Sequence, residues 1–160
     1  MSICRDAMHK VRGFYGIGLF QPKTDYNIGA VLRAAQCFNA AFVVASGRRY
    51  TRSPTDVLNT TKHIPFYNNV DDLFTHCPHD CEPVAVDLVP DAVPLDGFVH
   101  QQRAFYIFGP EDGTLGKAIT DRCARKIVIP SNFCLNLAAA VNVVLYDRTA
   151  KQLRDKRKEA

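Results

Sequence analysis

The stretch from Phe105 to Asp147 constrains the fold of this chain more than any other. It holds two short apolar runs, at 105–108 and 126–129, and each ends in a turn rich in Gly, Pro or Asn before a helical pattern begins. Repeated strand–turn–helix units are typical of α/β proteins with a parallel sheet. Ligands of such sheets bind beyond the carboxyl ends of the strands. Glu111 and Asn136 follow these two strand ends, so we predict a site there.

The rest of the chain continues the same alternation. Apolar runs predict strands at 14–20, 41–46, 64–67, 83–89, 105–108 and 126–129. Helical patterns predict helices at 28–38, 53–61, 70–74, 117–122 and 135–151, the first two capped by Asn27 and Ser53. We therefore predict one α/β domain over residues 1–160, with a mostly parallel sheet flanked by helices and a charged C-terminal tail at about 152–160.

Composition narrows the classes of function only slightly. The net charge of +4 permits an anionic partner such as nucleic acid but does not require one. No run approaches the roughly 20 apolar residues of a membrane helix, and the first twelve residues lack the apolar centre of a secretory signal. The six cysteines are scattered, and several lie in apolar patterns, so we expect reduced thiols in a cytoplasmic protein.

The glycine-rich segment 108–117 does not match the known phosphate-binding loops. It lacks the Gly-Lys-Ser/Thr ending of an ATP-binding loop, and the chain has no complete dinucleotide-binding glycine pattern. Gly109 and Gly113 would instead allow the backbone to approach closely around Glu111. A plain strand-to-helix turn with an exposed glutamate is the alternative.

Two further polar residues lie among apolar or small neighbours. Asn136 is expected on a helical face with Ala139 and Val143, where its amide needs partners, either loop backbone or a ligand. The helix around it is apolar nearly all round, which suggests that a partner subunit covers one side. Arg33 lies among small residues and has room for a planar contact with an anion. An ordinary surface arginine is the alternative.

Two loop segments suggest other ligands. Arg48, Arg49 and Arg52 surround Tyr50 after the strand at 41–46, a mixture that suits contacts to an RNA backbone and base, although a solvated loop is the alternative. The segment His76–Cys81, HCPHDC, resembles half of a zinc site. Structural zinc needs four ligands and no second pair is present, so we prefer a turn and expect no metal.

Three motifs then point to one family. They are NIGAVLR at 27–33, FGPEDGTLG at 108–116 and IPSNFCLNLAAAVNVVLYD at 129–147. In this order and spacing the chain resembles the SpoU/TrmH branch of the SPOUT RNA methyltransferases along essentially its whole length. The resemblance implies a C-terminal trefoil knot that binds S-adenosylmethionine (AdoMet). It also implies a homodimer, joined through the first and last helices, that methylates a ribose 2′-hydroxyl of tRNA or rRNA without a metal.

The resemblance also implies roles for single residues. Arg33 would be the catalytic arginine and Asn27 would shape the same site, whereas Glu111 and Asn136 would organise the second and third motifs. The cofactor would contact the following residues: Val86, Gly109, Ile129, Cys134 and Leu135. One position departs from the family, which usually has serine where this chain has Cys134. A thiol is a weaker hydrogen-bond donor than a hydroxyl.

The main hypothesis from the sequence is therefore an AdoMet-dependent RNA ribose 2′-O-methyltransferase. A tRNA substrate is favoured because the chain resembles the minimal members that act near the wobble position. The alternative is a knotted RNA-binding or assembly protein with weak or no activity, and Cys134 is the feature that favours it. A binding module stabilised by a metal at His76–Cys81 is a third interpretation.

Overall fold

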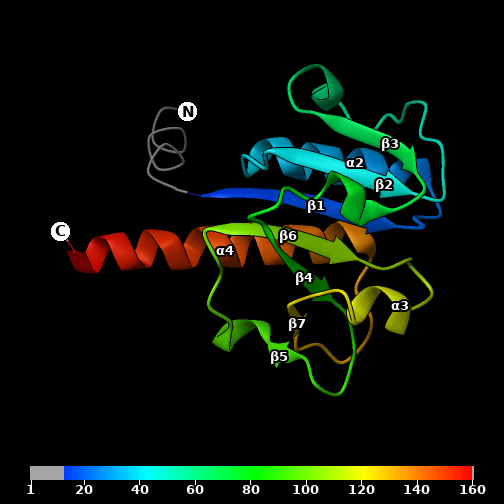
Figure 1. The fold of residues 1–160 in the computed structure, drawn as a ribbon. Coiled ribbons are helices and arrows are strands. Elements are labelled where there is room, and N and C mark those ends of the chain that lie inside the picture. Colours follow the sequence, from blue (N-terminus) through cyan, green and yellow to red (C-terminus); the bar gives the residue numbers. More distant parts are fainter. Residues whose placement is uncertain (1–12, 160) are drawn as a thin grey trace.

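A seven-stranded parallel sheet is the frame of the molecule. The computed structural model describes residues 13–159, and within them the strands lie in the order β3-β2-β1-β6-β4-β7-β5 (Figure 1). Every pair of neighbouring strands runs parallel, so the predicted α/β fold is confirmed. The strands are β1 (Phe14–Phe20), β2 (Phe42–Ser46), β3 (Phe66–Val70), β4 (Glu82–Val86), β5 (Val93–Pro94), β6 (Arg103–Phe108) and β7 (Arg125–Val128).

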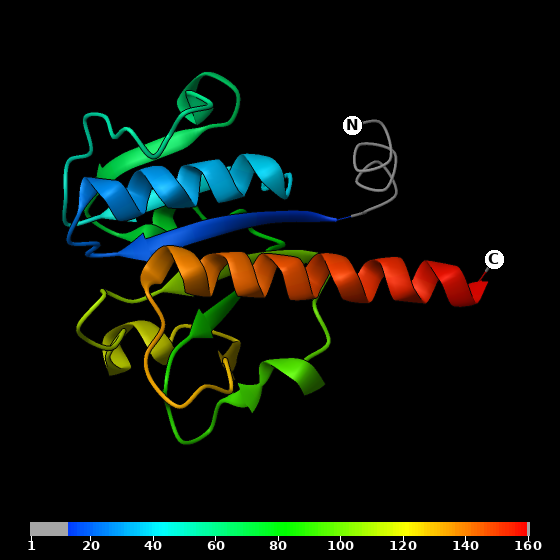
Figure 2. The same cartoon turned by 180° about the vertical axis from the view of Figure 1, so that it is seen from behind.

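Helices cover the two faces of the sheet unequally. The long helices α2 (Asp25–Cys37) and α4 (Leu137–Glu159) lie side by side on one face (Figure 2). The short elements are α3 (Lys117–Thr120) and the 3-10 helices η1 (Thr60–Lys62), η2 (Leu73–His76) and η3 (Leu95–Gly97). Along β6, Tyr106 packs into the core under the long helices, whereas Phe105 packs on the opposite face with residues such as Ile119 of α3.

The strand order brings three loops together. After β4 the chain runs to the edge strand β5, returns to form β6 between β1 and β4, and then inserts β7 between β4 and β5. The carboxyl ends of β4, β6 and β7 are therefore neighbours although they lie far apart in sequence. Such an edge of a parallel sheet is where ligands of α/β proteins bind.

Helix α2 begins earlier than its sequence pattern predicts, at Asp25 rather than residue 28. The side chain of Thr24 caps it by accepting from the backbone N–H of Asn27 at 3.2 Å. Asn27, predicted as the cap, instead lies in the first turn. This shift leaves its side-chain amide available for contacts outside the helix.

The predicted helix at 53–61 is wrong, because only Thr60–Lys62 is helical and the rest forms turns. The hydroxyls of Ser53 and Thr55 are bonded to each other at 2.7 Å, and that of Thr55 donates to the carbonyl of Tyr26 at 2.8 Å. Side-chain bonds of this kind compete with helix formation. Here they fasten the segment to α2.

Other boundaries shift by a few residues. The strand predicted at 64–67 is β3 at Phe66–Val70, β4 stops at Val86 rather than 89, and the helix predicted at 70–74 is η2. Asp72 caps η2 by accepting from the N–H of Phe74 at 3.1 Å. Helix α4 starts after Asn136, which was expected inside it, and continues to Glu159 through most of the predicted charged tail.

A buried polar network fixes α4 to the sheet. Arg148 is fully buried, and its guanidinium donates to the carbonyls of Gln101 and Gln102 at 2.6 and 3.0 Å and to the hydroxyl of Tyr106 at 2.9 Å. His100 bonds Tyr106 through one ring nitrogen and the carboxylate of Asp147 through the other. Burial lowers the pKa of His100 to about 4, so its ring is neutral at physiological pH.

Candidate functional site

A cavity of about 520 Å³ opens at the carboxyl ends of β4, β6 and β7, beside the first turns of α4. Its wall contains all five residues that the sequence suggested for cofactor contact: Val86, Gly109, Ile129, Cys134 and Leu135. Cys134 is exposed at this wall. The fold thus gathers these residues from three separate loops, and their part in binding stays a prediction.

The loop after β6 is fixed by close packing at Gly109 and by hydrogen bonds to Asp87. A side chain at Gly109 would begin 3.3 Å from the backbone nitrogen of Leu115, so the two segments pack backbone to backbone. The carboxylate of Asp87 accepts from the N–H of Leu115 at 2.8 Å and from that of Leu88 at 2.7 Å. Asp87 was not among the residues predicted for the site, although a carboxylate directly after an apolar strand is a usable signal.

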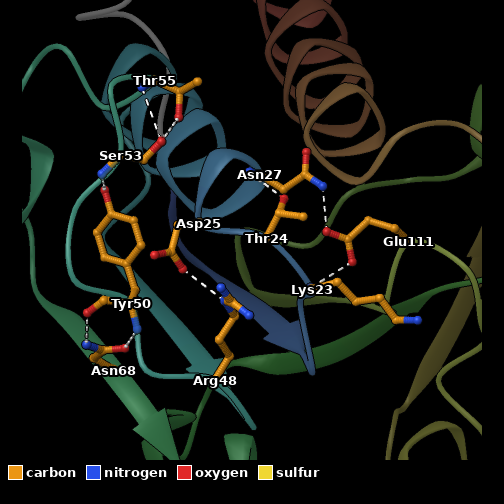
Figure 3. Close-up of polar contacts among 10 residues, drawn as sticks. All are labelled: Lys23, Thr24, Asp25, Asn27, Arg48, Tyr50, Ser53, Thr55, Asn68 and Glu111. Atoms are coloured by element: carbon orange, nitrogen blue, oxygen red, sulfur yellow. Dashed lines mark hydrogen bonds and ion pairs between the residues drawn. The ribbon is translucent and has the colours of Figure 1, made fainter.

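Three of the predicted site residues form one hydrogen-bonded chain. The amide of Asn27 donates to one oxygen of Glu111, and the backbone N–H of Lys23 donates to the other at 2.9 Å (Figure 3). The side-chain amide of Asn136 donates to the side-chain carbonyl of Asn27 at 3.0 Å. Each residue comes from a different motif, so this relay of Asn27, Glu111 and Asn136 ties the three motifs together.

The hydrogen bonds of the relay can run in only one direction, from Asn136 to Asn27 to Glu111. The side-chain carbonyl of Asn136 accepts from the N–H groups of Ala138 and Ala139 at 3.0 and 3.3 Å, as a helix cap does. An ionised carboxylate only accepts, and helix N-terminal N–H groups only donate, so both asparagine amides are fixed in orientation. Both oxygens of Glu111 accept hydrogen bonds from the chain itself, so its carboxylate is held in one orientation by Asn27 and the backbone of Lys23.

Arg33 is not part of this relay. It is exposed on α2, and none of the ion pairs within residues 13–159 includes it. Arg33 follows Asn27 by six positions along α2, which turns the two side chains about 120° apart. A single chain therefore does not bring Arg33 to the relay.

The arginine loop after β2 is ordered by its docking on α2 and β3. Tyr50 is buried and its hydroxyl accepts from the N–H of Ser53 at 3.0 Å, while Asn68 bonds both backbone groups of Tyr50 (Figure 3). The ring of Tyr50 therefore lies in the core, and the arginines are the exposed part of this loop. All three arginines are exposed, but Arg48 pairs with Asp25 at 2.9 Å, whereas Arg49 and Arg52 are in none of the ion pairs among residues 13–159.

The zinc-like segment folds as the end of η2 followed by a turn. The ring of His76 stacks on Tyr67 with 4.3 Å between centroids, and the thiol of Cys77 faces the carbonyl of Cys81 at 3.6 Å. Burial raises the pKa of Cys77 to about 11, which disfavours the thiolate that binds metals. Among the described residues no three His, Cys, Asp or Glu side chains could hold a metal ion.

Two other observations concern the described part of the chain as a whole. The five cysteines within it are free thiols, as expected, whereas Cys4 lies outside the described residues. None of its helices combines the length and apolar character that a membrane span requires.

The family follows from a comparison with family models. The model of the SpoU rRNA Methylase family matches residues 16–146, a span that includes all three motifs and the whole relay. The chain belongs to this SpoU family. Comparison of the sequence with curated proteins returned no match.

Solved structures resemble the chain in fold at low sequence identity. The TrmH/SpoU tRNA modifying enzyme of A. aeolicus is 18% identical with a TM-score of 0.79, and the match covers 97% of this chain and 83% of that one. A structure solved to explain the 2-OH methylation of C/U34 on tRNA is 20% identical with a TM-score of 0.71, covering 94% and 97%.

A third relative was solved together with its cofactor. The SpoU methyltransferase AviRb from Streptomyces viridochromogenes in complex with AdoMet is 21% identical, with a TM-score of 0.74, and the match covers 89% of this chain. The chain spans 62% of the length of AviRb, so the SpoU domain here corresponds to part of that protein.

Proposed function

We propose that the chain transfers the methyl group of AdoMet to a ribose 2′-hydroxyl of RNA. The observation that carries this proposal is the relay of Asn27, Glu111 and Asn136, which fixes the three SpoU motifs beside the cavity. Membership of the SpoU family supports RNA methylation, and the AdoMet complex of AviRb supports the cofactor.

The cavity fits a ligand of this kind. Its volume of about 520 Å³ lies within the range of small-molecule sites, and its wall is mostly apolar with a few polar groups. Val86, Ile129 and Leu135 would bury the apolar parts of AdoMet, and the backbone around Gly109 can come close to it. When bound, AdoMet supplies a methyl group already activated by the positive sulfur.

The residues of the chain then have to position the RNA. In the transfer the C–S bond breaks and a bond forms between the methyl carbon and the ribose oxygen, whose proton leaves to solvent or an RNA phosphate. Arg33 would hold that phosphate with its planar guanidinium and so align the hydroxyl behind the methyl group. The relay would keep the loops around Glu111 and Asn136 in place while the RNA binds.

A homodimer is part of this proposal. Tyr146 and Val143 of α4 are 65% and 39% exposed, and they line a broad hollow together with Phe38 and Leu153. Exposed apolar side chains gathered on one helix face are typical of a subunit interface. Since Arg33 does not reach the relay of its own chain, we propose that the second copy contributes its Arg33 to the site. A trefoil knot around α4 is proposed from the family resemblance.

The favoured substrate is tRNA. The structure solved for methylation of C/U34 on tRNA is matched over 97% of its own length, so it has almost the same size as this chain. Arg49 and Arg52 are exposed and would contact the RNA backbone, with Arg48 as a third contact. We propose a cytoplasmic location, where such an RNA is available.

The test is transfer of labelled methyl groups from AdoMet to total RNA, followed by nuclease digestion and identification of the methylated nucleoside. The proposal expects a ribose-methylated nucleoside from the tRNA fraction. Label on a base, or none in any RNA fraction with the dimeric protein, would contradict it.

The second candidate is an RNA-binding protein with weak or no activity. Cys134 favours it, because an exposed thiol stands at the cavity wall where the family usually has serine. Replacing Cys134 by serine separates the two. A large gain of methyl transfer in Cys134→Ser over the unmodified chain would support the second candidate. Methyl transfer that is readily measured in both proteins and equal between them supports the enzyme.

A further inference from the structure

The cavity wall carries three carboxylates and no basic side chain of its own. Its lining includes the carboxylates of Asp87, Glu111 and Asp112 and contains no lysine, arginine or histidine. A cavity of this charge disfavours phosphorylated ligands and favours cations, because charges separated by a low-dielectric space interact more strongly than in water.

The three carboxylates differ in what they hold. Glu111 is engaged by Asn27 and by the backbone of Lys23, and Asp112 pairs with the ammonium group of Lys23. Asp87 accepts only from backbone N–H groups, those of Leu88 and Leu115, and is in none of the ion pairs among residues 13–159. Its charge is therefore unpaired and can be removed without breaking the relay.

We propose that Asp87 makes the cavity selective for the cationic methyl donor over its neutral product. This inference rests on the proposed function. At neutral pH AdoMet carries a positive sulfur in addition to its ammonium and carboxylate groups, whereas S-adenosylhomocysteine, the product of the transfer, has a neutral sulfur. The two molecules otherwise differ by a single methyl group, so a charge in the wall distinguishes them better than shape does.

This selectivity would serve turnover. Loss of the methyl group removes the positive charge on sulfur, and with it the attraction to Asp87, at the moment when the product has to leave. Asp87 is only half-buried at the wall of a cavity that opens to solvent, so salt should weaken this interaction.

The test compares the affinities of the two ligands by isothermal titration calorimetry. The proteins are the full chain, Asp87→Asn, Asp87→Glu and, as a control, Asp71→Asn, which removes an exposed carboxylate that is not part of the cavity wall. We expect Asp87→Asn to weaken binding of AdoMet about tenfold more than binding of S-adenosylhomocysteine. Asp87→Glu and Asp71→Asn should keep the preference of the unmodified chain.

The ratio of the affinities for AdoMet and S-adenosylhomocysteine shows whether Asp87 acts through its charge or only by holding the loop in place. If Asp87 only braced Leu88 and Leu115, both ligands would weaken in parallel in Asp87→Asn, and that result overturns the inference. If Asp87→Asn fails to fold, the unmodified chain is titrated at low and high salt. Its preference for AdoMet must then narrow at high salt, and an unchanged preference overturns the inference. If the unmodified chain binds neither ligand, the proposed function itself fails.

Discussion

The side-chain amide of Asn136 donates a hydrogen bond to the side-chain carbonyl of Asn27, 3.0 Å away and 109 residues earlier in the sequence. Asn136 also caps α4, and Asn27 also donates to Glu111, so the bond joins the starts of two helices to the loop after β6. The three motifs are therefore joined by one continuous set of hydrogen bonds. A change at any member of the relay should be felt in all three motifs.

Asn27→Asp tests the polarity of the relay. The substitution keeps the shape of the side chain but replaces its NH2 group by a carboxylate oxygen. That oxygen cannot donate to Glu111, and its negative charge repels the Glu111 carboxylate. We expect a loss of about 1–3 kcal/mol of stability and a loss of most methyl transfer. Thermal unfolding and the transfer assay measure the two effects. Asn39→Asp, at an exposed position outside the relay, is the matched control. Equal losses of stability and of methyl transfer in the two variants would refute donation from Asn27 to Glu111.

Gly29→Ala tests whether docking of the 53–55 segment on α2 supports the arginine loop. A Cβ atom at Gly29 would lie 2.4 Å from the hydroxyl of Thr55 and 2.7 Å from the Cβ of Ser53, so the segment must move away. We expect a loss of about 1–3 kcal/mol and weaker RNA binding. Gly97→Ala is the control, because nothing lies within 4 Å of its added Cβ. Unaltered RNA binding in Gly29→Ala would show that docking of residues 53–55 on α2 is not needed for RNA binding.

The three arginines of the loop should contribute unequally to RNA binding. Arg48 has to leave its ion pair with Asp25 to meet a phosphate, whereas Arg49 and Arg52 are in no ion pair among residues 13–159. We expect Arg49→Ala and Arg52→Ala each to lower the affinity for RNA, and each to reduce its dependence on salt concentration, more than Arg48→Ala does. Filter binding over a series of salt concentrations is the measurement, and identical losses in all three variants would be the contrary result.

The buried histidine predicts how stability depends on pH. The pKa of His100 is lowered to about 4 in the folded chain, and its ordinary value is 6.5, so the unfolded state binds more protons between these values. The stability that depends on neutral His100 is present above pH 6.5 and is lost as the pH falls through about 4. Melting temperatures between pH 7 and 4 should fall less steeply in His100→Gln, and parallel curves would speak against this origin.

Much of the fold could be predicted because its strands are short apolar runs with clear turns. The failures have local causes. The segment at 53–61 has a helical pattern, but the hydroxyls of Ser53 and Thr55 bond to each other and to α2 instead. The pattern of the arginine loop did not show that the ring of Tyr50 lies in the core, where Asn68 and Ser53 hold it. Neither outcome depends on residues close in sequence alone.

The sequence marked several residues that the fold gathers at one edge of the sheet, but not their arrangement, and their roles stay predictions. Each motif marked its own polar residue, and the strand ends indicated a common edge of the sheet. That Asn27 reaches both Glu111 and Asn136 depends on the start of α2 at Asp25, set by the cap at Thr24. Asp87 was missed because the strand was predicted to run to residue 89, which placed Asp87 inside it, whereas β4 ends at Val86.

The central claim is that Arg33 acts on the RNA and not on the cofactor, and a paired measurement on Arg33→Ala tests it most directly. Calorimetry with AdoMet and the transfer assay with tRNA are carried out on the same preparation. The account predicts AdoMet affinity close to that of the unmodified chain together with loss of methyl transfer. Full methyl transfer by Arg33→Ala would contradict it.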